Sequence, residues 1–170
     1  MDTLLQIEKK EKGSYKVLFM AVGAAILIVA AIVGFYVSRP SHEKTKVEIL
    51  QGALFEGTPE FEEISKKIAI QNDADNTFQS PTGLGTITMF TRSKVRNMSD
   101  KTITALQVRV SVLDQFDKVI REKAQIVIPT DKVQTIAPNS DITINIPVEG
   151  FSKDDDRARV RWKVTAVKVQ

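Results

Sequence analysis

The hydrophobic and polar positions of this chain follow two different patterns. From Val17 to Val37, 21 consecutive residues carry no charged side chain. Beyond Gly85, apolar residues instead alternate with polar ones, and turn-forming residues bound each alternating run. The first pattern is typical of a helix that crosses a membrane, and the second of β-strands with one face on a core. The sequence therefore predicts an apolar helix followed by a β-rich domain.

The uncharged run has the length of a transmembrane helix. At about 1.5 Å per residue, it extends roughly 30 Å, which matches the hydrocarbon thickness of a bilayer. Tyr15 and Tyr36 stand near its ends, and Lys16 and Arg39 flank it, as is typical of membrane interfaces. A cleavable export signal has a shorter apolar region and a small-residue cleavage site, whereas this run ends in FYVSRP. We expect an uncleaved anchor in preference to a helix buried in a soluble core.

The flanking charges weakly favour an amino terminus on the cytoplasmic side. Lysines precede the run in slightly greater number than basic residues follow it, and a long carboxy-terminal domain is translocated largely regardless of its charge. We expect a cytoplasmic tail at 1–16, a transmembrane helix at 17–37, a juxtamembrane linker at 38–57 and an extracytoplasmic domain at 58–170. The expected location is the inner cell membrane, crossed once, and the lack of cysteine fits a bacterial envelope.

Small residues within the run would let a second helix approach closely. Ala21 with Ala25, and Ala30 with Gly34, form two small-xxx-small pairs. Alanine and glycine are common in membrane helices, so a plain anchor is the favoured interpretation and helix–helix packing the alternative.

Four alternating rows predict the strands of an antiparallel β-sandwich. Their apolar members are Leu106, Val108, Val110 and Val112; Ile120, Ala124, Ile126 and Ile128; Ile142, Ile144, Ile146 and Val148; and Ala158, Val160, Trp162, Val164 and Ala166. Pro147 cannot donate to a ladder, so we expect it on an edge strand or at a bulge. The change of parity at Val167 predicts a bulge or the end of sheet pairing.

The segment before Gly85 has a less regular pattern. Thr58, followed by Pro59 and acidic residues, predicts a short helix, and IAIQN at 68–72 predicts a strand. Residues 73–85 are dense in turn formers and predict a loop. Residues 46–57 predict either a first strand or a lead-in to the domain.

Turn and strand residues recur in a known order after residue 94. VRN at 95–97 ends a strand with V-x-N, Val110 to Asp114 ends the next strand with an aspartate, and IAPNSD at 136–141 forms a later turn. This order resembles the FxLYD domain of membrane-anchored bacterial proteins of unknown function. Where that family has glycine in two turns, this chain has Asp117 and Asn139, residue types that tolerate left-handed backbone. The resemblance implies a small Ig-like sandwich on a membrane anchor and implies no chemistry.

Composition disfavours most catalytic and metal-binding classes. The chain has no cysteine, which removes disulfides, thiolate nucleophiles and thiolate-bound metals. The single histidine, His42, falls in the expected linker. Asp114 with Asp117, and Asp154 to Asp156, fall in a predicted hairpin turn and loop, where solvated turn acids are expected, and DDD lacks the spacing of a calcium loop. GLG at 83–85 lacks the third glycine of a dinucleotide fingerprint. We predict no catalytic residue, cofactor or metal.

The charges indicate one candidate contact surface. With 24 basic and 21 acidic side chains, the net charge of +3 is too small to predict a nucleic-acid partner. RARVRWKV places four cations on one face of a predicted strand: Arg157, Arg159, Arg161 and Lys163. A second basic row on the same sheet would extend this face into a ladder: Arg92, Lys94 and Arg96. An ordinary hydrated sheet face is the favoured interpretation, and contact with an anionic partner is the alternative.

Two functions are compatible with these features. The favoured one is a non-enzymatic, single-span envelope protein whose Ig-like domain is an interaction or scaffolding module, an accessory subunit of a larger membrane complex. Its expected partners are the bilayer and other membrane-protein subunits. The alternative is a binder of anionic lipid or acidic envelope polymer through the basic sheet face. An enzyme is the least favoured class.

Overall fold

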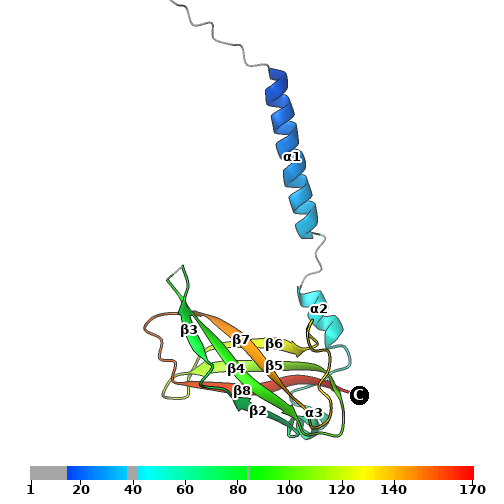
Figure 1. Ribbon diagram of the computed structural model, residues 1–170, viewed down its shortest axis with the longest axis vertical. Helices are drawn as coiled ribbons and strands as arrows, with labels where there is room; N and C mark the ends of the chain where they lie inside the picture. Colours follow the sequence, from blue (N-terminus) through cyan, green and yellow to red (C-terminus); the bar gives the residue numbers. More distant parts are fainter. Residues whose placement is uncertain (1–14, 38–41, 84) are drawn as a thin grey trace, which may run out of the picture. The chain divides into compact units, whose positions relative to one another are not determined.

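The computed structural model describes residues 15–37, 42–83 and 85–170. Contacts between residues divide the chain into two compact units, Met1–Lys44 and Thr45–Gln170. The second unit is mainly β, and its antiparallel sheets are consistent with the expected sandwich (Figure 1).

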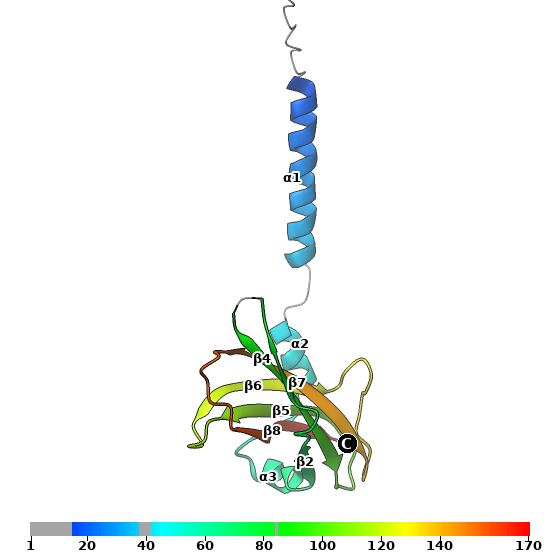
Figure 2. The same cartoon turned by 60° about the vertical axis from the view of Figure 1, so that its left-hand side comes forward.

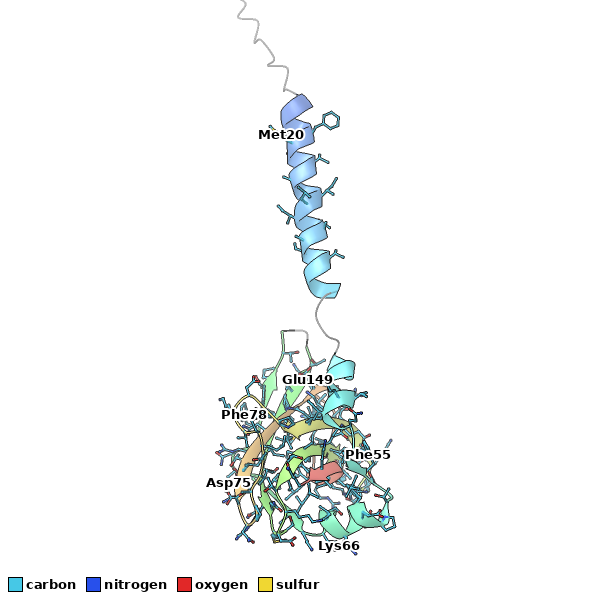
Figure 3. All side chains as sticks on the ribbon, turned by 90° about the vertical axis from the view of Figure 1, so that its right-hand side faces the viewer. Met20, Phe55, Lys66, Asp75, Phe78 and Glu149 are labelled. Carbon is cyan, nitrogen blue, oxygen red and sulfur yellow. The ribbon has the colours of Figure 1, made fainter. Side chains whose placement is uncertain are left out.

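Helix α1 spans Tyr15–Val37 and contains the uncharged run. The side chains described within it, those of residues 19–34, are all exposed, and Figure 3 labels Met20 among them. Phe19 is 74% exposed and Leu27 is 72% exposed. Among the described residues, no helix meets both the length and the hydropathy that a membrane span requires.

Part of the expected linker at 38–57 has regular structure. Helix α2 spans His42–Ile49, and its last turn carries Lys46, where a cation favours the helix dipole. Strand β1, Leu54–Phe55, then pairs with β8. Of the two interpretations of residues 46–57, the structure shows the first strand at Leu54–Phe55. This short strand gains its hydrogen bonds from a partner more than a hundred residues away.

Helix α3, Pro59–Ser65, forms as the sequence predicts. The Thr58 hydroxyl accepts a hydrogen bond from the N–H of Phe61 at 3.3 Å, and Pro59 occupies the first helical turn. Phe61 and Ile64 are buried, so the helix is fixed to the domain through its apolar face.

Two antiparallel sheets share the hydrophobic core. The first, here called the β8 sheet, has the order β1-β8-β5-β6, and Figure 2 shows its three long strands side by side: β8 (Arg159–Val169), β5 (Ile103–Leu113) and β6 (Val119–Ile128). The second, the β4 sheet, has β4 (Ile87–Asn97) between β7 (Asp141–Phe151) on one side and β2 (Ile68–Asn72) and β3 (Phe78–Pro81) on the other. Both sheets contribute fully buried side chains, among them Leu106, Ile128, Ile146 and Phe151.

Strand β3 lies where the sequence predicted a loop at 73–85. Phe78 pairs with Phe90 and Pro81 with Ile87 across the antiparallel ladder with β4. The segment has no alternation of its own, so its extended form depends on hydrogen bonds to β4 that local sequence does not reveal.

The predicted strand rows agree with the structure in β5 and β7. Val108, Val110 and Val112 are fully buried. In β7, Ile144, Ile146 and Val148 are buried, and Ile142 is half-buried. Pro147 lies in β7, which among the described residues pairs with β4 alone and is therefore an edge strand, as expected. In β8 the pairing shifts after Val164, so that Thr165 is the extra residue of a bulge, and the predicted change of parity is confirmed.

The row predicted in β6 does not lie on one buried face. Ile128 is buried, Ala124 is exposed, and Ile120 and Ile126 are half-buried. The cause is a pair of register shifts between β5 and β6. Between the two shifts, Ala124 and Ile126 lie opposite outward residues of β5 and therefore on the outer face of the sheet. Ala158, expected to begin the fourth row, is exposed and precedes β8.

The turns at Asp117 and Asn139 both use left-handed backbone. Asp117 has φ 65° and Asn139 has φ 55°, and they are the non-glycine residues with positive φ in the described part of the chain. Because aspartate and asparagine adopt this conformation more readily than other side chains, the predicted turn geometry is confirmed.

A buried amide joins the end of β4 to two loops. Asn97 Nδ2 donates to the carbonyls of Lys101 at 2.8 Å, Ile136 at 3.1 Å and Ala137 at 3.2 Å. Its Oδ1 accepts from the N–H and the hydroxyl of Ser99 at 3.0 and 2.7 Å. Asn97 is inaccessible to solvent, and its amide groups all have partners. The three carbonyls each accept a further hydrogen bond, from Ser99 Oγ, the Ile103 N–H and Ser140, so Asn97 adds a second donor that ties the two loops to β4.

Candidate functional site

Strand β8 separates its side chains into a charged row and an apolar row. Arg159, Arg161 and Lys163 are exposed on the outer face of the β8 sheet. Val160 and Trp162 are half-buried against the core, and Val164 is buried. The alternation of a strand therefore produces a basic face, defined here as Arg159, Arg161 and Lys163, as predicted for these three residues.

Arg157 does not belong to this face. It lies two residues before β8 begins, and its guanidinium donates to the Ser152 carbonyl at 2.6 Å and to Gln79 Oε1 at 3.0 Å. The guanidinium also lies over the ring of Phe151, 5.7 Å from the centroid. The prediction of four cations on one strand face was wrong at this position, because Arg157 joins the loop after β7 to β3.

Arg159 and Arg161 share one carboxylate. Asp117 Oδ1 lies 3.2 Å from Nη1 of Arg159 and 3.5 Å from Nη2 of Arg161, and Nη2 of Arg159 also donates to the Gln115 carbonyl. Asp117, the left-handed residue of the turn between β5 and β6, thus also supplies the negative charge that faces the two arginines. One carboxylate opposite two guanidinium groups leaves an excess positive charge on this part of the face.

Lys163 is paired with Glu56, the residue after β1. The Lys163 ammonium donates to Glu56 Oε1, and Arg109 lies beside Lys163 in the pairing of β5 with β8. This hydrogen bond lowers the pKa of Glu56 below its ordinary value; desolvation opposes it, and the charges of Lys163 and Arg109 add to the lowering. Glu56 is therefore a stable anion on the outer side of β8.

The second basic row lies on the other sheet. Arg92, Lys94 and Arg96 belong to β4, which is not part of the β8 sheet, so the expected basic ladder does not form. Arg92 lies 3.4 Å from a carboxylate oxygen of Asp73, and Lys94 lies 2.9 Å from one of Asp141. The two basic rows are thus separate surfaces on opposite sheets, because strand order, and not sequence, decides which rows meet.

A groove borders the inner side of β8. It has a volume of about 320 Å³, and its walls come from α3, β2 and β8, which Figure 2 shows next to one another. Phe61, Ile68, Ile70 and Trp162 supply apolar lining. The Trp162 indole N–H donates to Asn72 Oδ1 at 3.1 Å, which fixes the ring across the two sheets.

The acidic residues considered in the sequence are hydrogen-bond acceptors in turns. Asp114 Oδ1 accepts from the N–H groups of Phe116 and Lys118 at 2.8 and 2.9 Å. Asp155 accepts from the Ser152 N–H at 2.7 Å, and Asp156 accepts from the Gln115 N–H at 2.9 Å. Within the described ranges, no group of three or more His, Cys, Asp or Glu side chains is placed to hold a metal ion. The side chain of His42 lies outside the described residues.

An exposed aromatic pair on the β4 sheet was missed in the sequence. The rings of Phe78 and Phe90 stack with centroids 4.9 Å apart and planes inclined by 16°. Phe78, labelled in Figure 3, is 59% exposed. Phe78 fell in the predicted loop, so the sequence had no signal that would place it opposite Phe90.

The small residues of α1 form two separate surfaces. Successive residues of an α-helix are rotated by about 100°, which places the pair Ala30 and Gly34 on roughly the opposite side of the helix from Ala21 and Ala25. All four are exposed. They therefore provide two short contact points instead of one continuous small-residue stripe.

No protein-family model matches this chain, and a search of curated proteins found no match.

Proposed function

We propose that this chain is a non-enzymatic, single-pass membrane protein whose extracytoplasmic Ig-like domain is an interaction module, an accessory subunit of a larger membrane complex. Helix α1 would be the anchor, with the amino terminus in the cytoplasm. The β domain would present its sheet faces and edges to neighbouring subunits. The observation that carries this proposal is the combination of an uncharged 21-residue run with a helix whose described side chains are all exposed.

The exposed apolar surface of α1 supports the anchoring role. Residues 19–34 are almost all apolar and include the large side chains of Phe19, Met20 and Leu27. Exposing so many large apolar side chains to water is unfavourable at about 25 cal/mol per Å² of surface, whereas lipid tails accept them without cost. A helical conformation also satisfies the backbone hydrogen bonds that a bilayer cannot.

The character of the β domain supports an interaction role. Asp114 and Asp117 serve a turn and ion pairs. The accessible surfaces of the domain include the basic face, the groove beside β8 and the Phe78–Phe90 pair. Exposed aromatic and arginine side chains are enriched where proteins meet other proteins. The resemblance to FxLYD domains agrees with such a module, because the residues that carry the resemblance form turns and strands and imply no catalytic chemistry.

The test is membrane extraction followed by cross-linking of the full chain. We expect the chain to remain in the membrane after washing with alkaline carbonate, with residues 17–37 intact in the mature polypeptide. Gentle detergent extraction with cross-linking should then recover stoichiometric neighbouring chains. Release by carbonate would contradict the anchor, and recovery as a lone monomer under several mild conditions would contradict the accessory-subunit role.

A second function is favoured by the shared carboxylate of Arg159 and Arg161. Because one carboxylate faces two guanidinium groups, this part of the basic face keeps an excess positive charge, which suits anionic lipid headgroups or an acidic envelope polymer. Replacing Arg159, Arg161 and Lys163 with glutamine should then abolish retention on anionic vesicles. The matched control replaces three exposed lysines away from this face, Lys66, Lys101 and Lys132, and should retain binding. Equal retention of both variants would refute this second function.

A further inference from the structure

Strand β1 covers only the carboxy-terminal part of β8. Its two residues pair with Val167 and Ala166, and the Glu56 N–H donates to the Thr165 carbonyl at 3.2 Å. Gly57, with φ 96°, then turns the chain away into α3. Within the described residues, β8 from Arg159 to Val164 therefore pairs with β5 alone.

The backbone groups on this open edge can be assigned from the neighbouring hydrogen bonds. The Thr165 carbonyl points towards β1, and the Ala158 N–H donates to the Leu113 carbonyl on the β5 side at 2.9 Å. Backbone polar groups in an antiparallel strand alternate between its two neighbours. The Leu113 carbonyl faces β8, and Leu113 pairs with Arg159, so the N–H and C=O groups of Arg159, Arg161 and Lys163 are directed to β5. Those of Val160 and Trp162 are therefore directed to the open edge, where an added strand would pair with them. The bulge at Thr165 interrupts the alternation between this segment and the part of β8 that pairs with β1.

The two rows of β8 define the side chains that an added strand must carry. In antiparallel pairing, residues directly opposite each other lie on the same face. Residues of the added strand opposite Arg159, Arg161 and Lys163 would lie on the outer, basic face. Residues opposite Val160 and Trp162 would lie on the inner side, next to the groove between α3, β2 and β8, whose lining combines apolar side chains with Glu62 and Ser65.

Glu56 provides an example of the required acid within this chain. It follows β1 directly, lies on the line that an added strand would continue, and its carboxylate pairs with Lys163. A second copy of β8 would bring arginine opposite arginine, which is unfavourable. Charge complementarity thus favours an acidic partner strand over self-association.

We propose that the open edge of β8, Arg159 to Val164, is a docking site for an extended segment of a partner protein that alternates acidic and apolar residues. Its backbone would add a strand to the β8 sheet beyond β1, its acidic side chains would meet the basic face, and its apolar side chains would enter the groove. This inference rests on the proposed interaction role and specifies the chemistry of the partner.

The open edge is tested first by hydrogen exchange on the full chain in nanodiscs of phosphatidylcholine. The amides of Val160 and Trp162 should exchange at least about tenfold faster than those of Arg159, Arg161 and Lys163, which bond to β5. Equal, strong protection of all five amides would show that the edge is already covered and would overturn the proposal.

Docking is tested with an acetylated octapeptide that alternates glutamate and valine, added to the same nanodiscs. Trp162, the only tryptophan in the chain, reports binding through its fluorescence. Methylating the valine amides removes the N–H groups that would face β8, whereas methylating the glutamate amides alters only the solvent side. We expect at least about tenfold weaker binding for the first peptide and less than about threefold change for the second. Equal effects of the two methylations, or no binding, would overturn the proposal.

Charge specificity is tested with a lysine–valine peptide and the double variant Arg161→Glu and Lys163→Glu. The natural chain should prefer the glutamate peptide, and the variant should prefer the lysine peptide, with both preferences weakening at high salt. Retention on anionic vesicles without peptide binding would overturn the strand proposal in favour of a lipid surface. Concentration-dependent dimerisation that buries this edge would overturn it in favour of a second copy.

The outcomes separate this inference from the proposed function. A chain that resists carbonate and cross-links to neighbours, but does not bind the peptide, refutes only the docking site. A chain that binds the peptide but is washed from membranes by carbonate refutes the anchor and retains the docking site.

Discussion

Lys123 Nζ donates a hydrogen bond of 2.8 Å to the carbonyl of Pro147, so that a side chain from edge strand β6 covers the edge of β7 in the other sheet. Arg121 donates similarly to the Gly150 carbonyl at 3.2 Å. Pro147 needs no partner for an N–H, because it has none. This edge of the sandwich is therefore protected against strand addition, in contrast to the edge of β8.

Removing the buried amide of Asn97 should destabilise the domain. Asn97→Ala removes a buried amide that donates to three carbonyls and accepts from the N–H and hydroxyl of Ser99. We expect a loss of about 2–3 kcal/mol in the free energy of unfolding. Urea titration of the full chain in mild detergent, followed by Trp162 fluorescence, measures this change. The neighbouring Arg96→Ala, at an exposed position, should change stability by less than about 0.5 kcal/mol. Equal values for the two variants would contradict the structural role of Asn97.

The effect of a substitution at Asn139 on stability should depend only on how well the new residue adopts the left-handed backbone of this turn. Asn139 is exposed and has φ 55°, so Asn139→Gly should keep or slightly raise the stability. Asn139→Val should lower it by about 1–2 kcal/mol, because a β-branched side chain is strained at positive φ. The same urea titration compares the two variants, and a stable valine variant would show that the turn is not left-handed.

The register shifts in β6 predict different costs for two isoleucines of one apolar row. Ile128→Ala removes a fully buried side chain and should lower the free energy of unfolding by about 3 kcal/mol. Ile126→Ala, at a half-buried position, should cost about 1 kcal/mol or less. Thermal unfolding of both variants measures the difference. Similar costs would favour the uninterrupted alternation that the sequence suggests.

The pKa of Glu56 predicts a contribution to stability that depends on pH. The pKa of Glu56 is lowered in the folded chain, so its ionised carboxylate stabilises the fold at pH values above the ordinary pKa of a glutamate. This stabilisation is lost as the pH falls through the lowered pKa of the folded chain. A nuclear magnetic resonance titration of the Glu56 carboxyl group should show the low midpoint. Lys163→Ala should return the pKa of Glu56 towards its ordinary value, whereas Lys118→Ala, on the turn between β5 and β6, should leave it unchanged. An unchanged midpoint in Lys163→Ala would show that the pair does not form in solution.

The sequence by itself determined the local elements of this protein. The Thr58 cap, the alternation in β5 and β7, the bulge near Val167 and the left-handed turns at Asp117 and Asn139 could all be predicted. Each depends on residues close together in the chain: a cap hydroxyl and the N–H it accepts from, a period of two, or the backbone preference of one side chain. The apolar run of α1 was recognised for the same reason, since length and hydropathy are local properties.

Only the tertiary structure decided how those elements meet. The sequence could not reveal that β3 pairs with β4, that β6 is turned over by register shifts, or that the two basic rows lie on opposite sheets. It also could not show that β1 stops short and leaves the edge of β8 open. These features depend on hydrogen bonds and packing between residues distant in the chain, and a shift of one residue in pairing exchanges the two faces of a strand without changing its sequence pattern.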